Sequence, residues 1–229
     1  MPLEQIVVLA LVQGITEFLP ISSSGHLILI PAITHWKDQG LITDVMVHVG
    51  SLAAIIVYFW RDVLAMLRGA LHLARLKWSA EARLAVYVAA ATVPAVLFGL
   101  ILKSTGMLDK LRGVEVVAWN ALIFGVLLLA ADMLGVQKLK LENITFRSAM
   151  IIGLAQAMAL IPGTSRSGIT MTAARFLGYQ RAEAARFSFV LGIPAIAGAG
   201  LLTTFDAIES GEGISNDALL AAGLTFISA

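Results

Sequence analysis

Cysteine is absent from this chain of 229 residues, and charged residues are scarce. The absence of cysteine excludes disulfides, thiolate metal sites and cysteine nucleophiles. Charged residues make up 14% of the chain, whereas about 25% is usual for a soluble domain. A net charge of only +1 argues against nucleic acid as a partner. These shortages exclude an ordinary soluble domain.

Apolar residues dominate instead, because 59% of the chain is hydrophobic and the mean hydropathy is +0.87. The apolar runs reach the roughly 20 residues of a transmembrane helix and lack the alternation of a barrel strand. We therefore expect an all-α polytopic membrane protein. The only charge before Gln13 is Glu4, so the first run lacks the basic start of a secretory signal and should remain in the mature protein.

Two apolar stretches, 3–34 and 148–174, are interrupted by proline and glycine, and we expect each to form a re-entrant helical hairpin. The interrupting residues are Pro20, Gly25 and Pro31 in the first stretch and Pro162, Gly163 and Gly168 in the second. Each hairpin should place its polar break inside the membrane.

Transmembrane spans are expected over 44–60, 84–102, 114–134 and 187–208. Polar loops are expected over 61–83 and 135–147, and a short turn at Gly106, Asp109 and Gly113. The apolar run 218–229 is too short to cross, so we expect an incomplete span there and a natural chain that continues past Ala229.

An internal repeat is indicated by two similar stretches, QGITEFLPISSSG and QAMALIPGTSRSG. Gln13 precedes Gly25 by twelve residues, and Gln156 precedes Gly168 by the same distance. Both copies then reach a glycine inside a span, Gly50 and Gly192. We assign 1–134 to the first repeat and 148–229 to the second.

The basic residues are divided unevenly between the two sides of the membrane. If 61–83 is cytoplasmic, eleven lie in inside loops and four in outside loops, as the positive-inside rule requires. The inside residues are Arg61, Arg68, Arg75, Lys77, Arg83, Lys138, Lys140, Arg147, Arg175, Arg181 and Arg186, and the outside ones are Lys37, Lys103, Lys110 and Arg112. The hairpins then enter from opposite sides, so the repeats have inverted topology and their tips can meet near mid-membrane.

The first break carries the best candidates for chemistry. Gln13 and Glu17 are four residues apart and share one helix face. Ser22, Ser23, Ser24 and Gly25 follow, and then His26. Hydroxyl and backbone N–H donors at such a turn can bind an anion, and an imidazole can titrate near neutral pH.

The second break, PGTSRSG at 162–168, contains Arg166, the only basic residue placed in neither set of loops. Its neighbours are Gly163, Thr164, Ser165, Ser167 and Gly168. A guanidinium flanked by serines and glycines is suited to clamp a phosphate.

Structural explanations remain open for these residues. They are a snorkelling Arg166, a helix-packing Glu17, an interior His26 and a Gln13 that packs helices through its amide. Asp44 and His48, four apart on one face, either join the site or cap an interface. Ser51, Thr92, Asn120, Thr170 and Thr172 are interpreted as packing residues.

Arginine, carboxylate, serine and histidine together favour hydrolysis of a phosphoanhydride, which needs charge stabilisation and a placed nucleophile. The chain has neither a phosphate-loop motif nor a GxSxG elbow. The phosphatidic-acid-type phosphatases place a histidine six residues after their arginine, and here that position is Thr172. That alternative therefore lacks its nucleophile.

Three motifs resemble the undecaprenyl-diphosphate phosphatase family, the bacitracin-resistance type, over essentially the whole chain. They are (E/Q)GxTEFLPxSSxGH at Gln13 to His26, DVxxHxGS at Asp44 to Ser51, and PGxSRSG at 162–168. The resemblance implies an inner-membrane hydrolase that recycles the lipid carrier of peptidoglycan synthesis and gives bacitracin resistance. The expected partners are a polyprenyl diphosphate, membrane lipids and a second copy in a homodimer.

The resemblance also implies roles for individual residues. Glu17, Ser23, His26 and Arg166 would be catalytic, and Gln13, Ser22, Ser24, Gly163, Thr164, Ser165, Ser167 and Gly168 would bind substrate. Glu17 and Gln13 would hold a divalent cation, Mg²⁺ or Ca²⁺. Many relatives have glutamate in place of Gln13, which makes Glu17 the stronger ligand.

Two alternatives stay open at this point. Ser23 is the nucleophile with His26 as its base, or His26 activates water directly. A different class of function, a transporter or flippase of a lipid phosphate, would also suit inverted repeats with broken helices.

Overall fold

The computed structural model describes residues 1–107, 111, 113–211 and 213–229. The described residues form helices and no strand, apart from an isolated bridge between Leu139 and Tyr179. The helices are α1 (Leu3–Thr16), α2 (Ser23–Thr34), α3 (Gly40–Tyr58), α4 (Trp60–Ala74), α5 (Ala80–Ser104), α7 (Val114–Leu134), the 3-10 helix η1 (Leu141–Asn143), α8 (Phe146–Met158), α9 (Arg166–Phe176), α10 (Arg181–Glu209) and α11 (Asn216–Ser228). The all-α prediction is confirmed.

Four of these helices, α3, α5, α7 and α10, are long and apolar enough to cross a membrane. The predicted spans 44–60, 84–102, 114–134 and 187–208 fall on them in that order. The predicted incomplete span, 218–229, falls on α11. Asp109 of the predicted turn and two of the outside basic residues, Lys110 and Arg112, lie outside the described residues. The chain is therefore a multi-pass membrane protein.

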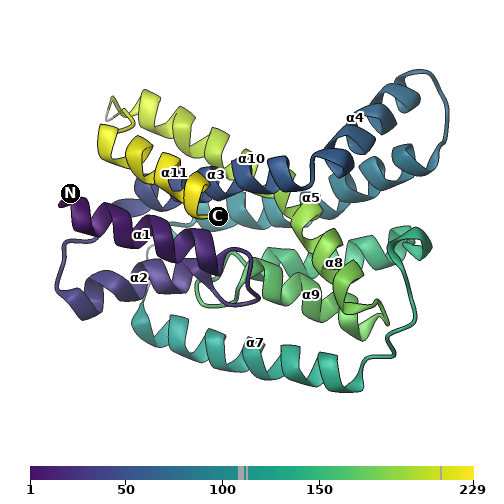
Figure 1. Ribbon diagram of the computed structural model, residues 1–229, viewed down its shortest axis with the longest axis horizontal. Helices are drawn as coiled ribbons and strands as arrows, with labels where there is room; N and C mark the ends of the chain where they lie inside the picture. The colour runs from purple at the N-terminus through teal and green to yellow at the C-terminus, as the bar shows by residue number, and fades with distance from the viewer. Residues whose placement is uncertain (108–110, 112, 212) are drawn as a thin grey trace.

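The two predicted hairpins are α1 with α2 and α8 with α9 (Figure 1). Each second helix starts in the same way. The Oγ of Ser22 accepts a hydrogen bond from the backbone N–H of Gly25 at 3.1 Å, and the Oγ of Ser165 accepts one from Gly168 at 3.1 Å. A serine is a favourable N-cap when its hydroxyl accepts a hydrogen bond from the backbone N–H three residues later, because that N–H has no partner inside the helix.

Pro31 was expected to interrupt the first hairpin, but it lies inside α2. A proline in a helix leaves the carbonyl four residues earlier without its usual donor. Here that carbonyl belongs to Leu27, and it accepts a hydrogen bond from Nε2 of Gln39 at 3.1 Å. The helix therefore continues past Pro31, and the real break of this hairpin lies between α1 and α2, at 17–22.

The predicted loop 61–83 is mostly helical, because α4 occupies its first two thirds. Figure 1 shows α4 and the start of α5 projecting together as a hairpin. Gly69 permits their close contact, since a Cβ there would lie 2.3 Å from the carbonyl oxygen of Glu81. The buried Asp62 accepts a hydrogen bond from Nε of Arg186 at 3.1 Å, which joins α4 to α10. Charged residues that suggested a loop thus form contacts between packed helices.

The centre of the molecule is built around α3 and α10, which pack against each other. The hairpin α1–α2 lies beside α3, and α8–α9 lies beside α5 and α10. Helix α11 packs on α1 and α3 as α5 packs on α8 and α10. This correspondence is consistent with the predicted repeat, and it brings the breaks of the two hairpins together.

Candidate active site

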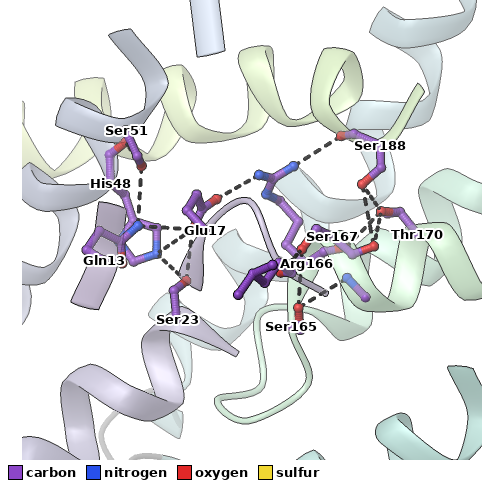
Figure 2. Close-up of polar contacts among 12 residues, drawn as sticks. Gln13, Glu17, Ser23, His48, Ser51, Ser165, Arg166, Ser167, Thr170 and Ser188 are labelled. Carbon is purple, nitrogen blue, oxygen red and sulfur yellow. Dashed lines mark hydrogen bonds and ion pairs between the residues drawn. The ribbon is translucent and has the colours of Figure 1, made fainter. Parts of the chain in front are cut away.

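Glu17 is the centre of a buried polar cluster at the junction of the two hairpins (Figure 2). It follows the last residue of α1 and is 5% exposed. Its Oε1 accepts a hydrogen bond from Nη2 of Arg166 at 2.7 Å, which is also an ion pair. Its Oε2 accepts from Oγ of Ser23 at 2.8 Å. The structure therefore brings together three residues that the sequence predicted to share a site.

Gln13 lies one turn before Glu17 on α1 and is fully buried. Its Nε2 donates to Oε2 of Glu17 at 3.0 Å and lies 3.3 Å from Oγ of Ser51 on α3. The Ser51 hydroxyl in turn donates to the carbonyl of His48 at 2.9 Å. Gln13 thus fixes the carboxylate of Glu17 relative to α3. Ser51, interpreted as a packing residue, belongs to the same network.

His48 approaches Ser23 from α3. Its Nε2 lies 3.4 Å from Oγ of Ser23 and 3.6 Å from Oε2 of Glu17. Its Nδ1 lies 2.7 Å from the carbonyl oxygen of Asp44. Because a carbonyl can only accept, Nδ1 carries a proton, and a neutral ring presents the lone pair of Nε2 to Ser23. The sequence left the role of His48 open, and the structure places it in the cluster.

His26 lies elsewhere. Its side chain is exposed, and its Nδ1 lies 2.6 Å from the carbonyl oxygen of Ser22, one turn back on its own helix. Among the described contacts, none joins His26 to Glu17, Ser23 or Arg166. The structure therefore does not bring His26 into the cluster.

Arg166 is the first residue of α9, and its guanidinium lies against α10. Its Nη1 donates to the carbonyl of Ser188 at 3.1 Å. A Cβ added at Gly192 would lie 1.9 Å from the same nitrogen. The glycine therefore provides the space that the guanidinium occupies. Since a guanidinium has five N–H donors, the bonds to Glu17 and Ser188 leave others for an anion.

The serines around Arg166 bind backbone of the other hairpin. The hydroxyl of Ser165 donates to the carbonyl of Ile21 at 2.9 Å, and that of Ser167 donates to Leu19 at 3.0 Å. Gly168 permits this contact, because a Cβ there would lie 3.1 Å from the carbonyl oxygen of Pro20. These three residues, predicted to bind substrate, join the two breaks in the structure.

The remaining candidates lie in the same two turns. Ser22 caps α2, and its Oγ lies 3.3 Å from Oγ of Ser24. Gly163 has a φ of +92° and packs on α7, where a Cβ would lie 2.4 Å from the carbonyl oxygen of Val117. Thr164 is buried, and its Oγ1 has no hydrogen-bond partner among the described residues. A direct contact of these residues with substrate stays a prediction.

The donor set suits a divalent cation only in part. The described residues contain no group of three or more His, Cys, Asp or Glu side chains that could hold a metal ion. The buried Oε1 of Gln13, however, has no hydrogen-bond partner there and could bind a cation beside Glu17. Mg²⁺ is commonly held by one or two carboxylates together with substrate phosphates. Glu17 and Gln13 therefore fit an ion shared with a phosphate ligand, not a preformed metal cage.

Known proteins resemble this chain along nearly its whole length. An undecaprenyl-diphosphatase of Erythrobacter litoralis is 48% identical over an alignment of 247 residues, which covers 98% of this chain and 87% of that protein. An undecaprenyl-diphosphatase of Ruegeria pomeroyi is 50% identical over an alignment of 233 residues, which covers 100% of this chain and 86% of that protein. An undecaprenyl-diphosphatase of Alcanivorax borkumensis is 53% identical over an alignment of 206 residues, which covers 90% of this chain and 77% of that protein.

The family model described as bacitracin resistance protein BacA matches residues 6–229. This match includes both hairpins, and therefore both halves of the cluster around Glu17 and Arg166. Agreement with a family model over almost every residue, and with relatives at about half identity, shows that the chain belongs to the bacitracin resistance protein BacA family.

Proposed function

We propose that this chain is an integral membrane phosphatase that hydrolyses undecaprenyl diphosphate to undecaprenyl phosphate and inorganic phosphate. Its relatives carry the name undecaprenyl-diphosphatase. The observation that supports the reaction is the buried cluster in which Arg166, Ser23 and Glu17 meet (Figure 2). A cationic clamp and a hydroxyl held beside one carboxylate are the groups that phosphoryl transfer requires.

The clamp consists of Arg166 and two helix ends. Ser23 is the first residue of α2 and Arg166 is the first residue of α9, and both contact Glu17. The N-termini of two helices therefore converge at one point. Each N-terminus has backbone N–H groups without helical partners and a partial positive charge, which favour an anion. A diphosphate bound there meets these N–H groups and the remaining donors of Arg166.

Ser23 is positioned to act as the nucleophile, with His48 as its base. For the reaction, the Ser23 hydroxyl turns its proton from Oε2 of Glu17 to Nε2 of His48, which lies 3.4 Å away. Its Oγ then attacks the terminal phosphorus, and the proton passes to that nitrogen. The bond from phosphorus to the bridging oxygen breaks, and His48 gives its proton to the departing undecaprenyl phosphate. Water then attacks the phosphoserine through the same imidazole, which returns a proton to Oγ as inorganic phosphate leaves.

Glu17 holds the other groups in place. It binds Arg166 through Oε1 and both Ser23 and Gln13 through Oε2. A shared Mg²⁺ or Ca²⁺, held by Glu17 and Oε1 of Gln13, would add charge stabilisation on the phosphate oxygens. In the alternative route, His48 activates water directly, and Ser23 only donates a hydrogen bond to the phosphate.

We place the protein in the bacterial inner membrane, with the site open to the periplasm. The unequal distribution of Lys and Arg supports this orientation. A homodimer stays a prediction. Recycling of the lipid carrier for peptidoglycan synthesis, and bacitracin resistance, follow from the proposed reaction.

The experiment that tests this function is phosphate release from undecaprenyl diphosphate by the purified protein in detergent. A transporter is the alternative, since two broken hairpins meet at the site. Release of one phosphate per substrate supports the hydrolase. Movement of the lipid across liposomes without any release of phosphate would support the carrier and contradict the proposal.

A further inference from the structure

A cavity of about 530 Å³ lies between α7, α9 and α10, beneath the turn that follows α1. Its volume is in the range of small-molecule sites, roughly 300–1,000 Å³. Most of its lining is apolar and includes Phe18, Leu128, Leu129, Met171 and Phe189. We refer to it as the α7 groove.

The groove runs beside α7, which side-chain hydrogen bonds attach to neighbouring segments near both of its ends. Near its start, Nδ2 of Asn120 donates to the carbonyl of Pro162 at 3.0 Å. Near its end, the carboxylate of Asp132 accepts from Nε of Arg181 at 2.7 Å. Between these contacts α7 presents Gly125 and Leu129, which lie one turn apart on the face that also bears Asp132. Because Gly125 has no side chain, the space beside it stays open.

The far end of the groove is closed by paired charges. Arg175 is 2% exposed, and its Nε donates to Asp132 at 3.2 Å while its Nη1 donates to the carbonyl of Tyr179 at 2.7 Å. Asp132 also binds Arg181. A lipid phosphate at this end would have to displace a carboxylate that already occupies both arginines. The groove is therefore better suited to hydrocarbon than to a phospholipid headgroup.

The near end adjoins the candidate active site. Phe18 follows Glu17 in the chain, and its ring centroid lies 5.7 Å from that of Phe189. Phe189 follows Ser188, whose carbonyl binds Arg166. The groove thus begins beside the residues that would hold a diphosphate and runs along α9 away from them.

We propose that the α7 groove holds the isoprenoid segment next to the diphosphate of the substrate. This inference rests on the proposed function, because the hydrocarbon must leave a diphosphate bound at Arg166. At about 30 Å³ for each heavy atom, the share of one water molecule in the liquid, the cavity holds roughly 18 heavy atoms. That is a few isoprene units and not the whole undecaprenyl chain.

The groove should therefore make the enzyme sensitive to the first units of the chain. For the wild-type protein, kcat/KM should rise from dimethylallyl through geranyl to farnesyl diphosphate, by about 10-fold for each unit, the scale of a small group in an apolar pocket. It should change little from farnesyl to undecaprenyl diphosphate, because later units lie outside the groove.

The test variant is Gly125→Phe, assayed with all four substrates in the same detergent. A Cβ at Gly125 meets nothing within 4 Å, so the new side chain starts in open space beside the groove that Gly125 lines. The matched control is Gly198→Phe on α10, where a Cβ also meets nothing within 4 Å and which does not line the groove. Gly125→Phe should remove the rise with chain length, so that the longer substrates lose more kcat/KM than dimethylallyl diphosphate, whereas Gly198→Phe should keep the rise.

Three results would overturn the inference. They are a flat wild-type profile, an equal loss for every substrate in Gly125→Phe, and the same behaviour in both variants. An effect of Gly125→Phe that depended on added phosphatidylglycerol and not on substrate length would assign the groove to a phospholipid instead. Failure of the proposed function is distinguishable, because the wild-type protein would then release phosphate from none of the four substrates.

Discussion

At the scale of single residues, Glu17 connects three helices through one carboxylate. Gln13 comes from α1, Ser23 from α2 and Arg166 from α9. A buried carboxylate is costly unless its hydrogen bonds and charge are matched, and here both oxygens have partners. The sequence predicted that the breaks of the two hairpins, which carry Glu17 and Arg166, can meet, but it did not predict the ion pair between these two residues.

The histidine was harder to predict. His26 and His48 both lie in apolar helices, and each belongs to one of the three motifs. Which one faces Ser23 depends on how α2 and α3 are rotated about their axes. Leu27 and Ile28 lie on the buried face of α2, and the adjacent His26 therefore lies on the exposed face. Packing of this kind involves distant residues, so local sequence could not decide between the two rings.

The structure therefore predicts different outcomes for the two histidines. His48→Gln should lower kcat roughly 100-fold or more, the usual contribution of a general base. His26→Gln should retain most of the activity, because its ring makes no described contact with the cluster. Initial rates of phosphate release by the two purified variants, at equal thermal stability, measure the difference. A severe loss in His26→Gln with an active His48→Gln would return the base to His26.

At the scale of secondary structure, the sequence predicted the hairpins and the long helices well. Apolar runs of sufficient length and prolines at their breaks carry that information locally. It failed at α4, where Arg61, Asp62 and Arg68 suggested a solvated loop. Asp62 is buried by its pairing with Arg186, which lies 124 residues away. A pairing across such a distance cannot be predicted from a short window of sequence.

Helix α10 contributes a surface that the guanidinium of Arg166 contacts at Ser188 and Gly192. Gly192→Ala should displace the guanidinium, since the new Cβ would lie 1.9 Å from Nη1. A displacement of about 1 Å in a positioned group can cost about 100-fold in rate. Stability should be unchanged or slightly higher, because alanine is favoured over glycine in a helix by about 0.5–1 kcal/mol.

Activity and thermal midpoint of Gly192→Ala, measured together, check this expectation. Gly198→Ala is the control, since it makes the same change on the same helix where a Cβ meets nothing within 4 Å. Full activity in Gly192→Ala would show that Arg166 does not need this surface. Loss of both activity and stability would indicate a packing role for the glycine instead.

At the scale of the whole molecule, two hairpins inserted from opposite sides would explain how residues 149 positions apart meet at Glu17. The sequence indicated the repeat through Gln13 and Gln156, but the two halves differ at the site. Ser23 and Arg166 occupy equivalent positions at the starts of α2 and α9. One hairpin thus supplies a hydroxyl and the other a cation at the site.

The orientation in the membrane can be measured with single cysteines, because the chain has none of its own. Cysteines placed at Arg68 and Lys138 should be protected from an impermeant maleimide in intact cells, and one at Glu209 should be labelled. All three residues are exposed, so protection reflects the membrane and not burial. Labelling at position 68 from outside would reverse the orientation of both hairpins.

In the proposed reaction Ser23, held by Glu17 beside His48 and Arg166, attacks the terminal phosphate. Rapid quench with undecaprenyl diphosphate labelled in that phosphate tests it most directly. Label should be trapped on Ser23 at early times. The Ser23→Ala variant should trap no label and should turn over only at a small residual rate. Phosphate release with no trapped label, together with a Ser23→Ala variant that loses only about 10- to 100-fold, the scale of one positioning contact, would contradict it in favour of direct attack by water.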